Sequence, residues 1–364
     1  MHKVFNSLLG VLLIGGGMSV SAQTPTINPP SATPVAIPGA YTNTTINYIR
    51  TWEPDKPLTD PASVISATTD VRQTTQYFDG LGRPLQTVSK GISPAGRDLV
   101  APVIYDAFGR EQFKYLPYVP QTGNMNDGKF KTSPFAGQAA FYNNRTLNPG
   151  VLGDTVYYSR TDFEASPLNR PLNTYGPGDS WAKNDLTTVE RGGNRPVKME
   201  YLVNTIADSV RIWVMPASGT VPTSTAMYAA GQLYKNVITD EQGGKVVEYK
   251  DKEGQVVLKK VQLAASPGTA HVGWLCTYYV YDDLNNLRFV IPPLAVEKIH
   301  STWNAATVAT GLCFQYQYDH RRRMIEKRVP GAGPVHMVYD TRDRLVFTQD
   351  SAQRAKAPKE WLVT

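Results

Sequence analysis

The sequence predicts an all-β protein in which antiparallel β-hairpins repeat and lie side by side in a curved sheet. Its composition favours strands and turns, because 20 tyrosines accompany 29 glycines and 27 prolines in 364 residues. A motif of an aromatic residue followed by Asp recurs along the chain between short apolar runs. We therefore expect a hairpin array with a β-rich insertion and one or two short helices.

The first 22 residues have the pattern of a secretory signal peptide. Lys3 supplies a basic start, an apolar stretch runs from Leu8 to Ile14, and Val20-Ser21-Ala22 offers small residues before a cleavage point. The apolar stretch is too short to span a bilayer, and no later segment is apolar enough to do so. We expect an exported protein, secreted or at the cell surface, without a membrane span once the signal is removed.

Residues 23–45 are rich in Pro, Thr, Ser and Asn. Such a segment cannot bury enough apolar surface to offset the entropy cost of ordering, so it is predicted to be a disordered tether. Three further regions follow. Residues 46–116 hold the first hairpins, residues 117–246 form a β-rich insertion, and residues 247–364 hold further hairpins.

The recurring motif is interpreted as a hairpin turn. Its Asp carboxylate can accept backbone N–H groups within the turn, and the residue three positions later is expected to need a positive φ, which Gly, Asn and Asp tolerate. Arg322 is the exception to this rule, and its turn is expected to differ. The turn residues so predicted are Asp79 with Gly82, Asp106 with Gly109, Asp251 with Gly254, Asp282 with Asn285, Asp319, and Asp340 with Asp343.

The insertion contains a copy of the motif that departs from the others. Thr161-Asp162 followed by Asn169-Arg170 is interpreted as a repeat with an enlarged turn. Residues 138–143 and 294–303 are predicted helices, the second because it follows Pro292-Pro293.

Nothing in the sequence indicates catalysis, a cofactor or a metal site. No nucleophile elbow, zinc-protease, phosphate-loop or dinucleotide motif occurs. The repeated Asp residues are explained together by a role in turns, whereas a catalytic pair would single out one or two of them. The net charge of +6 is spread along the chain, which argues against nucleic acid as a partner. The one basic run, residues 321–328, is expected to be a solvated turn and strand.

The two cysteines, Cys276 and Cys313, each lie six residues before a motif Asp. Equivalent strands of neighbouring hairpins are separated by one strand, which places the two positions about 9–10 Å apart. A disulfide needs Cα atoms within about 7 Å. We therefore predict two free, half-buried thiols.

The six motif copies, of which residues 78–83 and 105–110 are the clearest, resemble the YD repeats of the RHS family. The segment FEASPLNRP at 163–171, with Pro177-Gly178 shortly before Trp181, resembles a domain of unknown function found upstream of RHS repeats in secreted Bacteroidota proteins. The resemblance covers about residues 46–364. It implies a strip of hairpins that in complete members winds into a hollow shell, often around a C-terminal toxin.

The resemblance implies a non-catalytic exported scaffold, the N-terminal part of a surface or toxin-delivery protein, acting as shell wall or plug. Its partners would be the remainder of the shell or a toxin cargo. The chain stops at Thr364 with no distal core motif, so we expect a truncated product, a gene fragment or a short orphan. The alternative is a carbohydrate-binding adhesin in which exposed strand aromatics stack on cell-surface glycans. The direction in which the tyrosines point separates these hypotheses.

Overall fold

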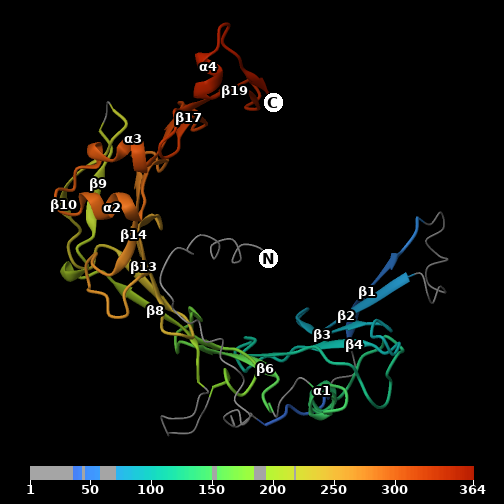
Figure 1. The fold of residues 1–364 in the computed structure, drawn as a ribbon. Coiled ribbons are helices and arrows are strands. Elements are labelled where there is room, and N and C mark those ends of the chain that lie inside the picture. Colours follow the sequence, from blue (N-terminus) through green and yellow to red (C-terminus); the bar gives the residue numbers. More distant parts are fainter. Residues whose placement is uncertain (1–35, 43–45, 58–70, 150–153, 184–193, 217–218) are drawn as a thin grey trace. The chain divides into compact units, whose positions relative to one another are not determined.

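The protein is described here from a computed structural model, which places residues 36–42, 46–57, 71–149, 154–183, 194–216 and 219–364 (Figure 1). The expected signal peptide and most of the expected tether lie outside these residues. The described chain is built mostly of antiparallel strands with a few short helices, which confirms the all-β fold class.

The strands are β1 (Asn47–Pro54), β2 (Val71–Phe78), β3 (Pro84–Ser89), β4 (Leu99–Pro102), β5 (Phe113–Tyr115), β6 (Tyr158–Phe163), β7 (Pro171–Tyr175), β8 (Val197–Val203), β9 (Arg211–Val214), β10 (Thr223–Met227), β11 (Tyr234–Thr239), β12 (Lys245–Lys250), β13 (Val256–Gln262), β14 (Trp274–Tyr281), β15 (Leu287–Ile291), β16 (Phe314–Tyr318), β17 (Met324–Arg328), β18 (Val335–Tyr339), β19 (Leu345–Gln349) and β20 (Leu362–Val363). The helices are α1 (Pro134–Asn143), α2 (Pro293–Ile299), α3 (Ala309–Leu312) and α4 (Ser351–Ala355), with short 3₁₀ turns at Ile206–Asp208 and Ala305–Thr307.

Three sheets contain these strands. One has the order β1-β2-β3-β4, one pairs β9 with β10, and the largest has fourteen strands in the order β20-β19-β18-β17-β16-β15-β14-β13-β12-β11-β8-β7-β6-β5. Neighbours in the large sheet are mostly consecutive in the chain, as expected when hairpins are laid side by side. The insertion of β9 and β10 between β8 and β11 is the one departure from chain order.

The chain forms two compact units. The first comprises the described residues within Met1–Val103, Tyr115–Tyr158 and Pro177–Asn194, and the second those within Ile104–Lys114, Ser159–Gly176 and Arg195–Thr364. The division into regions 46–116, 117–246 and 247–364 stays a prediction.

The first unit is centred on the β1–β4 sheet and α1. Its core contains the buried side chains of Tyr77, Val88, Val100 and Tyr118. Helix α1 begins at Pro134, four residues before the predicted start, and its Gln138 amide donates hydrogen bonds of 2.9 Å to the carbonyls of Leu116 and Tyr157.

The second unit has one large core on one face of its sheet. Burial alternates along β14, so that Cys276, Tyr278 and Val280 are buried while their neighbours are partly exposed. The β9–β10 hairpin and α2 pack into the same core as these residues. Helix α2 ends at Ile299, four residues before the predicted end, and Trp303 beyond it has a positive φ of 52°.

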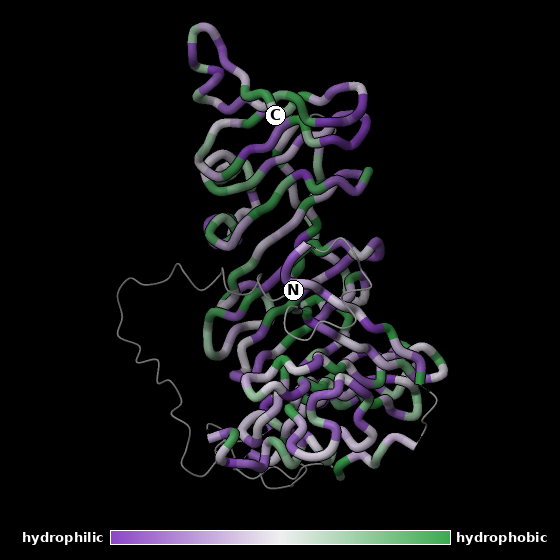
Figure 2. The backbone as a smooth tube through the Cα atoms, turned by 90° about the vertical axis from the view of Figure 1, so that its right-hand side faces the viewer, coloured by the Kyte–Doolittle hydropathy of each residue, from purple (hydrophilic) through white to green (hydrophobic). Residues whose placement is uncertain are grey.

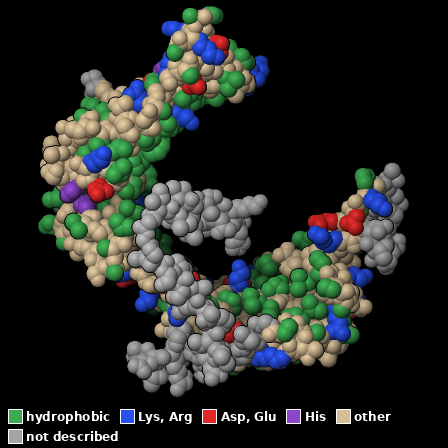
Figure 3. Space-filling model, viewed as in Figure 1, with side chains coloured by type: hydrophobic (Ala, Val, Ile, Leu, Met, Phe, Trp, Pro, Cys, Tyr) green, Lys and Arg blue, Asp and Glu red, His purple; other side chains and the backbone are tan. Residues whose placement is uncertain are grey.

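The hydropathy of the residues also alternates along the chain. Figure 2 shows hydrophobic and hydrophilic residues mixed along the strands rather than gathered in long apolar segments. Figure 3 shows hydrophobic side chains interspersed with polar ones over the visible face of both units. Among the described residues, no helix has the length and hydropathy needed to cross a bilayer.

Both cysteines are free. Cys276 lies in β14 and Cys313 immediately precedes β16, so β15 separates the two positions as predicted. The expectation of half-burial was wrong, because the thiols are 2% and 0% exposed. They face the large core beneath the helices rather than an open sheet surface.

Candidate functional site

The candidate site is the series of turns built around the motif Asp residues. In the first turn, the Gly82 N–H donates to the Asp79 carbonyl at 3.0 Å, and the Asp79 N–H donates to the Arg83 carbonyl at 2.9 Å. One Asp79 carboxylate oxygen accepts the N–H groups of Leu81 and Arg83, both at 2.9 Å. With Gly82 at φ 76° and a register shift at Phe78, this is a type I turn closed by a G1 bulge.

The other predicted turns have the same backbone hydrogen bonds. In each copy the N–H of the motif Asp donates to the carbonyl four residues later, and the third residue after the Asp donates back to it; these Asp residues are Asp106, Asp251, Asp282, Asp319 and Asp340. Positive φ occurs at Gly109, Gly254, Asn285 and Asp343, as well as at Arg322. The expectation that the turn of Arg322 differs was therefore wrong.

Arg322 takes the left-handed conformation at φ 63° because its surroundings hold it there. Its N–H closes the turn on the Asp319 carbonyl at 2.9 Å, and its guanidinium donates to the Leu284 carbonyl in the preceding turn. The strain of a left-handed non-glycine residue is thus offset by turn closure and by a link between turns.

Two more turns of this type were not predicted from the sequence, and the predicted enlarged turn has a different acidic residue from the one expected. In one turn the Asp240 N–H donates to the Gly244 carbonyl, and Gly243 has a φ of 90°. In another the Ser93 N–H donates to the Arg97 carbonyl, and Gly96 has a φ of 68°. The enlarged turn is organised by Glu164 rather than by Asp162, because the Glu164 N–H donates to the Arg170 carbonyl at 3.0 Å. Each has an oxygen acceptor at the start and a residue with positive φ near the end, which is the signal that could have revealed them.

An arginine four residues after the Asp completes several turns. Its Nε donates to the second carboxylate oxygen in Asp79–Arg83 (2.7 Å), Asp106–Arg110 (2.8 Å), Asp319–Arg323 (2.7 Å) and Asp340–Arg344 (2.8 Å). Partial desolvation opposes ionisation of Asp319, but hydrogen bonds from the Arg323 side chain and from backbone N–H groups outweigh it and lower the pKa of that carboxyl to about 2. The Arg170 side chain likewise lowers the pKa of Glu164 to about 2.

Two of these arginines, Arg110 and Arg323, also contact the next turn. The guanidinium carbon of each lies over the aromatic ring that precedes the following acidic residue, at 4.7 Å for Arg110 over Phe163 and 4.9 Å for Arg323 over Tyr339. Arg170 lies over Tyr201 at 4.4 Å, although Tyr201 is followed by Leu202 and not by an acidic residue. Each guanidinium therefore joins an ion pair in its own hairpin to a cation–π contact in the next.

The aromatic residue returns a hydrogen bond. The hydroxyl of the tyrosine before an Asp donates to the carbonyl of the first strand residue after the preceding turn. The pairs are Tyr281 to Val256 (3.4 Å), Tyr318 to Leu287 (3.0 Å) and Tyr339 to Met324 (2.8 Å), and Tyr201 donates to Pro171 in the same way (3.1 Å). We call this set of Asp, Arg and Tyr contacts the turn ladder.

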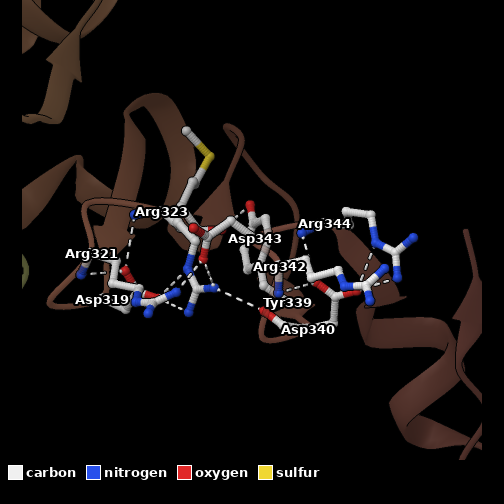
Figure 4. Close-up of polar contacts among 9 residues, drawn as sticks. Asp319, Arg321, Arg323, Tyr339, Asp340, Arg342, Asp343 and Arg344 are labelled. Carbon is white, nitrogen blue, oxygen red and sulfur yellow. Dashed lines mark hydrogen bonds and ion pairs between the residues drawn. The ribbon is translucent and has the colours of Figure 1, made fainter.

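Figure 4 shows the part of the turn ladder nearest the end of the chain. Asp343 accepts hydrogen bonds from Arg321 at 2.6 Å and Arg323 at 2.7 Å, so two arginines of one turn hold a carboxylate of the next. The basic run is therefore not merely solvated, as had been expected, because part of it is paired with acidic residues.

The ladder has no arrangement suited to metal binding. Within the described part of the chain, no group of three or more His, Cys, Asp or Glu side chains is placed to hold a metal ion. Its acidic groups instead accept hydrogen bonds from backbone N–H groups and from arginine side chains. The turn ladder therefore joins turns to one another.

The fold and the turn ladder define a β-hairpin repeat protein. Residues 50–193 match a family described as Domain of unknown function (DUF6443). No curated protein sequence matches this chain.

Solved structures share the fold at low sequence identity. One described as the crystal structure of TcdB2-TccC3-TEV is 15% identical with a TM-score of 0.50; the alignment covers 87% of this chain and 13% of that one. A second, TcdB2-TccC3 without its hypervariable C-terminal region, is 15% identical with a TM-score of 0.47, covering 77% of this chain and 11% of that one. This chain thus corresponds to a small fraction of those proteins.

Proposed function

We propose that this chain is a non-catalytic scaffold, the N-terminal part of an exported RHS-repeat surface or toxin-delivery protein, in which it forms shell wall or a plug. The observation that carries the proposal is the turn ladder. Arg110, Arg170 and Arg323 and the ladder tyrosines contact a neighbouring hairpin, so the motif is used to join successive hairpins into one strip. The YD-type motifs, the match over residues 50–193 and the likeness to TcdB2-TccC3-TEV support it.

The position of the ladder tyrosines favours a scaffold over a glycan-binding adhesin. Tyr201, Tyr318 and Tyr339 donate their hydroxyls to backbone carbonyls, and arginines stack on two of these rings. A ring face covered by its own chain is not offered to a sugar. The proposed partners are therefore the rest of a shell and a toxin cargo rather than cell-surface glycans.

Electron microscopy of the complete polypeptide from the native locus tests the proposal. We expect a strip of hairpins that continues into a hollow shell, with this chain in its wall or at one end. N-terminal sequencing of the exported material should begin at Gln23. A compact body without a shell, or strong binding of the purified chain on a glycan array, would contradict the scaffold.

A further inference from the structure

Among the residues that the structure describes, the Asp251 turn has no arginine to pair with its carboxylate. The residue four positions after Asp251 is Gln255, whereas Arg323 occupies that position after Asp319. The Asp251 carboxylate accepts the Gln255 N–H at 2.8 Å, and within the described part of the chain it has no ion pair. The neighbouring Asp282 turn also lacks an arginine at this position, but Arg288 reaches its carboxylate at 3.3 Å.

A cavity of about 250 Å³ lies where the missing side chain would be. Its lining includes Asp251, Gln255 and Tyr281, which correspond to Asp319, Arg323 and Tyr339 in the filled copy of Figure 4. A cavity of this size is several times the roughly 30 Å³ that a water molecule takes up in the liquid. It therefore has room for a planar cation between the carboxylate and the ring.

The charge of the cavity suits a cation. Asp251, Asp282 and Asp283 line it together with one guanidinium, that of Arg211, and Asp282 is already paired with Arg288. Arg211 is already engaged, since it donates to the Ser224 hydroxyl at 3.1 Å and stacks over Trp303 at 5.2 Å. Burial raises the pKa of Tyr281 most, and the negative charge of Asp251 raises it further. The Asp251 carboxylate therefore interacts electrostatically with the tyrosine whose ring a cation would cover.

Aromatic rings form another part of the cavity wall. Trp213, which is partly buried, is one of the lining residues. Tyr228, whose pKa is raised by burial and by the charge of Asp251, adds another ring to the wall.

We propose that this cavity binds a guanidinium group, that of an arginine residue or a small arginine derivative, between Asp251 and Tyr281. The incoming group takes the place that Arg110, Arg170 and Arg323 occupy in their own repeats. A guanidinium fits better than an ammonium, because its planar fork can pair with a carboxylate while its face lies on the ring. The site is independent of the proposed scaffold role.

Calorimetric titration of the full chain with acetyl-arginine amide tests the site. We expect saturable binding of one ligand per chain and no binding of acetyl-citrulline amide, which has the same shape without the charge. Gln255→Arg, which fills the cavity from within, should weaken binding at least tenfold and raise the melting temperature. Asp251→Asn should also weaken binding at least tenfold, with folding checked by circular dichroism.

A variant in which the arginine of another turn is removed provides the matched control. Arg323→Gln opens the corresponding space between Asp319 and Tyr339, so this variant should bind a second equivalent of acetyl-arginine amide. If a capped Gly-Arg-Gly peptide binds at least tenfold more tightly than the amide, the guanidinium that the site binds belongs to an arginine residue of a protein. If the two bind with equal affinity, it belongs to a small arginine derivative. Absence of binding to the native chain, or undiminished binding to Gln255→Arg, would overturn the proposal.

Discussion

The hydroxyl of Tyr318 donates a 3.0 Å hydrogen bond to the carbonyl of Leu287, 31 residues earlier in the chain. Tyr318 ends strand β16, and Leu287 begins β15, the neighbouring strand of the preceding hairpin. The motif therefore has two roles. It forms a hairpin turn, and its tyrosine joins that hairpin to the preceding one. Removing single ladder contacts tests how much each contributes to stability.

Tyr318→Phe removes this hydrogen bond and keeps the ring. We expect the free energy of unfolding to fall by about 1 kcal/mol, the usual net worth of such a bond. Tyr316→Phe is the control, because Tyr316 lies two residues earlier on the same strand and its hydroxyl makes no hydrogen bond within the described residues. Urea denaturation measures both, and equal losses in the two variants would contradict a stabilising role for the Tyr318 bond.

The first turn offers a paired test of positive φ. A Cβ added to Gly80 or to Gly82 would meet nothing within 4 Å, but only Gly82 has a positive φ, 76°. Gly82→Ala should lower stability by about 1 kcal/mol through backbone strain, whereas Gly80→Ala should leave it unchanged or raise it by a few tenths. Thermal melts of both variants give the answer, and a stable Gly82→Ala protein would refute the need for a left-handed residue there.

The backbone of the repeats could be predicted because turn closure depends on local chemistry. An acceptor at Asp79 and a flexible Gly82 are sufficient to define the bend, and the same pattern located the turns at Asp106, Asp282 and Asp340. The turn at Ser93 was missed, and the enlarged turn was assigned to Asp162 rather than to Glu164, because a hydroxyl or a longer carboxylate can serve as the acceptor. A search for Asp alone finds fewer turns than exist, because the turn requires only a side-chain oxygen acceptor at its first position.

The contacts between hairpins could not be predicted from one sequence. Whether Arg110 lies over Phe163 depends on strand register across more than fifty residues, which no local pattern encodes. The same holds for the cavity at Gln255, since a missing side chain matters only once its neighbours in space are known. Arg322 shows the converse, because tertiary contacts hold a residue in a conformation that its own preference opposes.

The ladder carboxylates make stability depend on pH. The pKa of Asp319 falls from its ordinary value of 3.8 to about 2 in the folded chain, and that of Glu164 from 4.5 to about 2. Between about pH 4.5 and pH 2 the unfolded chain binds protons that the folded chain does not, so stability present above this window is lost as pH falls through it. Urea midpoints measured from pH 6 to pH 2.5 should decline.

The variants Asp319→Asn and Glu164→Gln isolate these groups. Each removes one carboxylate that titrates in the window, so each should be less stable than the native chain at pH 6 and should show a shallower decline. The Asp319 and Glu164 side chains are 14% and 13% exposed. The change in slope is the better readout, because stability at pH 6 also reflects the altered hydrogen bonds in each variant. A native profile that stays flat down to pH 2.5 would contradict the depressed pKa values.

The two thiols should be inert until the core opens. Burial raises the pKa of Cys276 to about 11 and that of Cys313 to about 12, so almost no thiolate is present at pH 8. We expect no reaction with a thiol-specific disulfide reagent in the native chain and two thiols titrated in denaturant. A non-reducing mass should equal that of the reduced chain, because β15 keeps the two positions apart. A mass lower by two hydrogens would contradict the separation of equivalent strands on which the hairpin array depends.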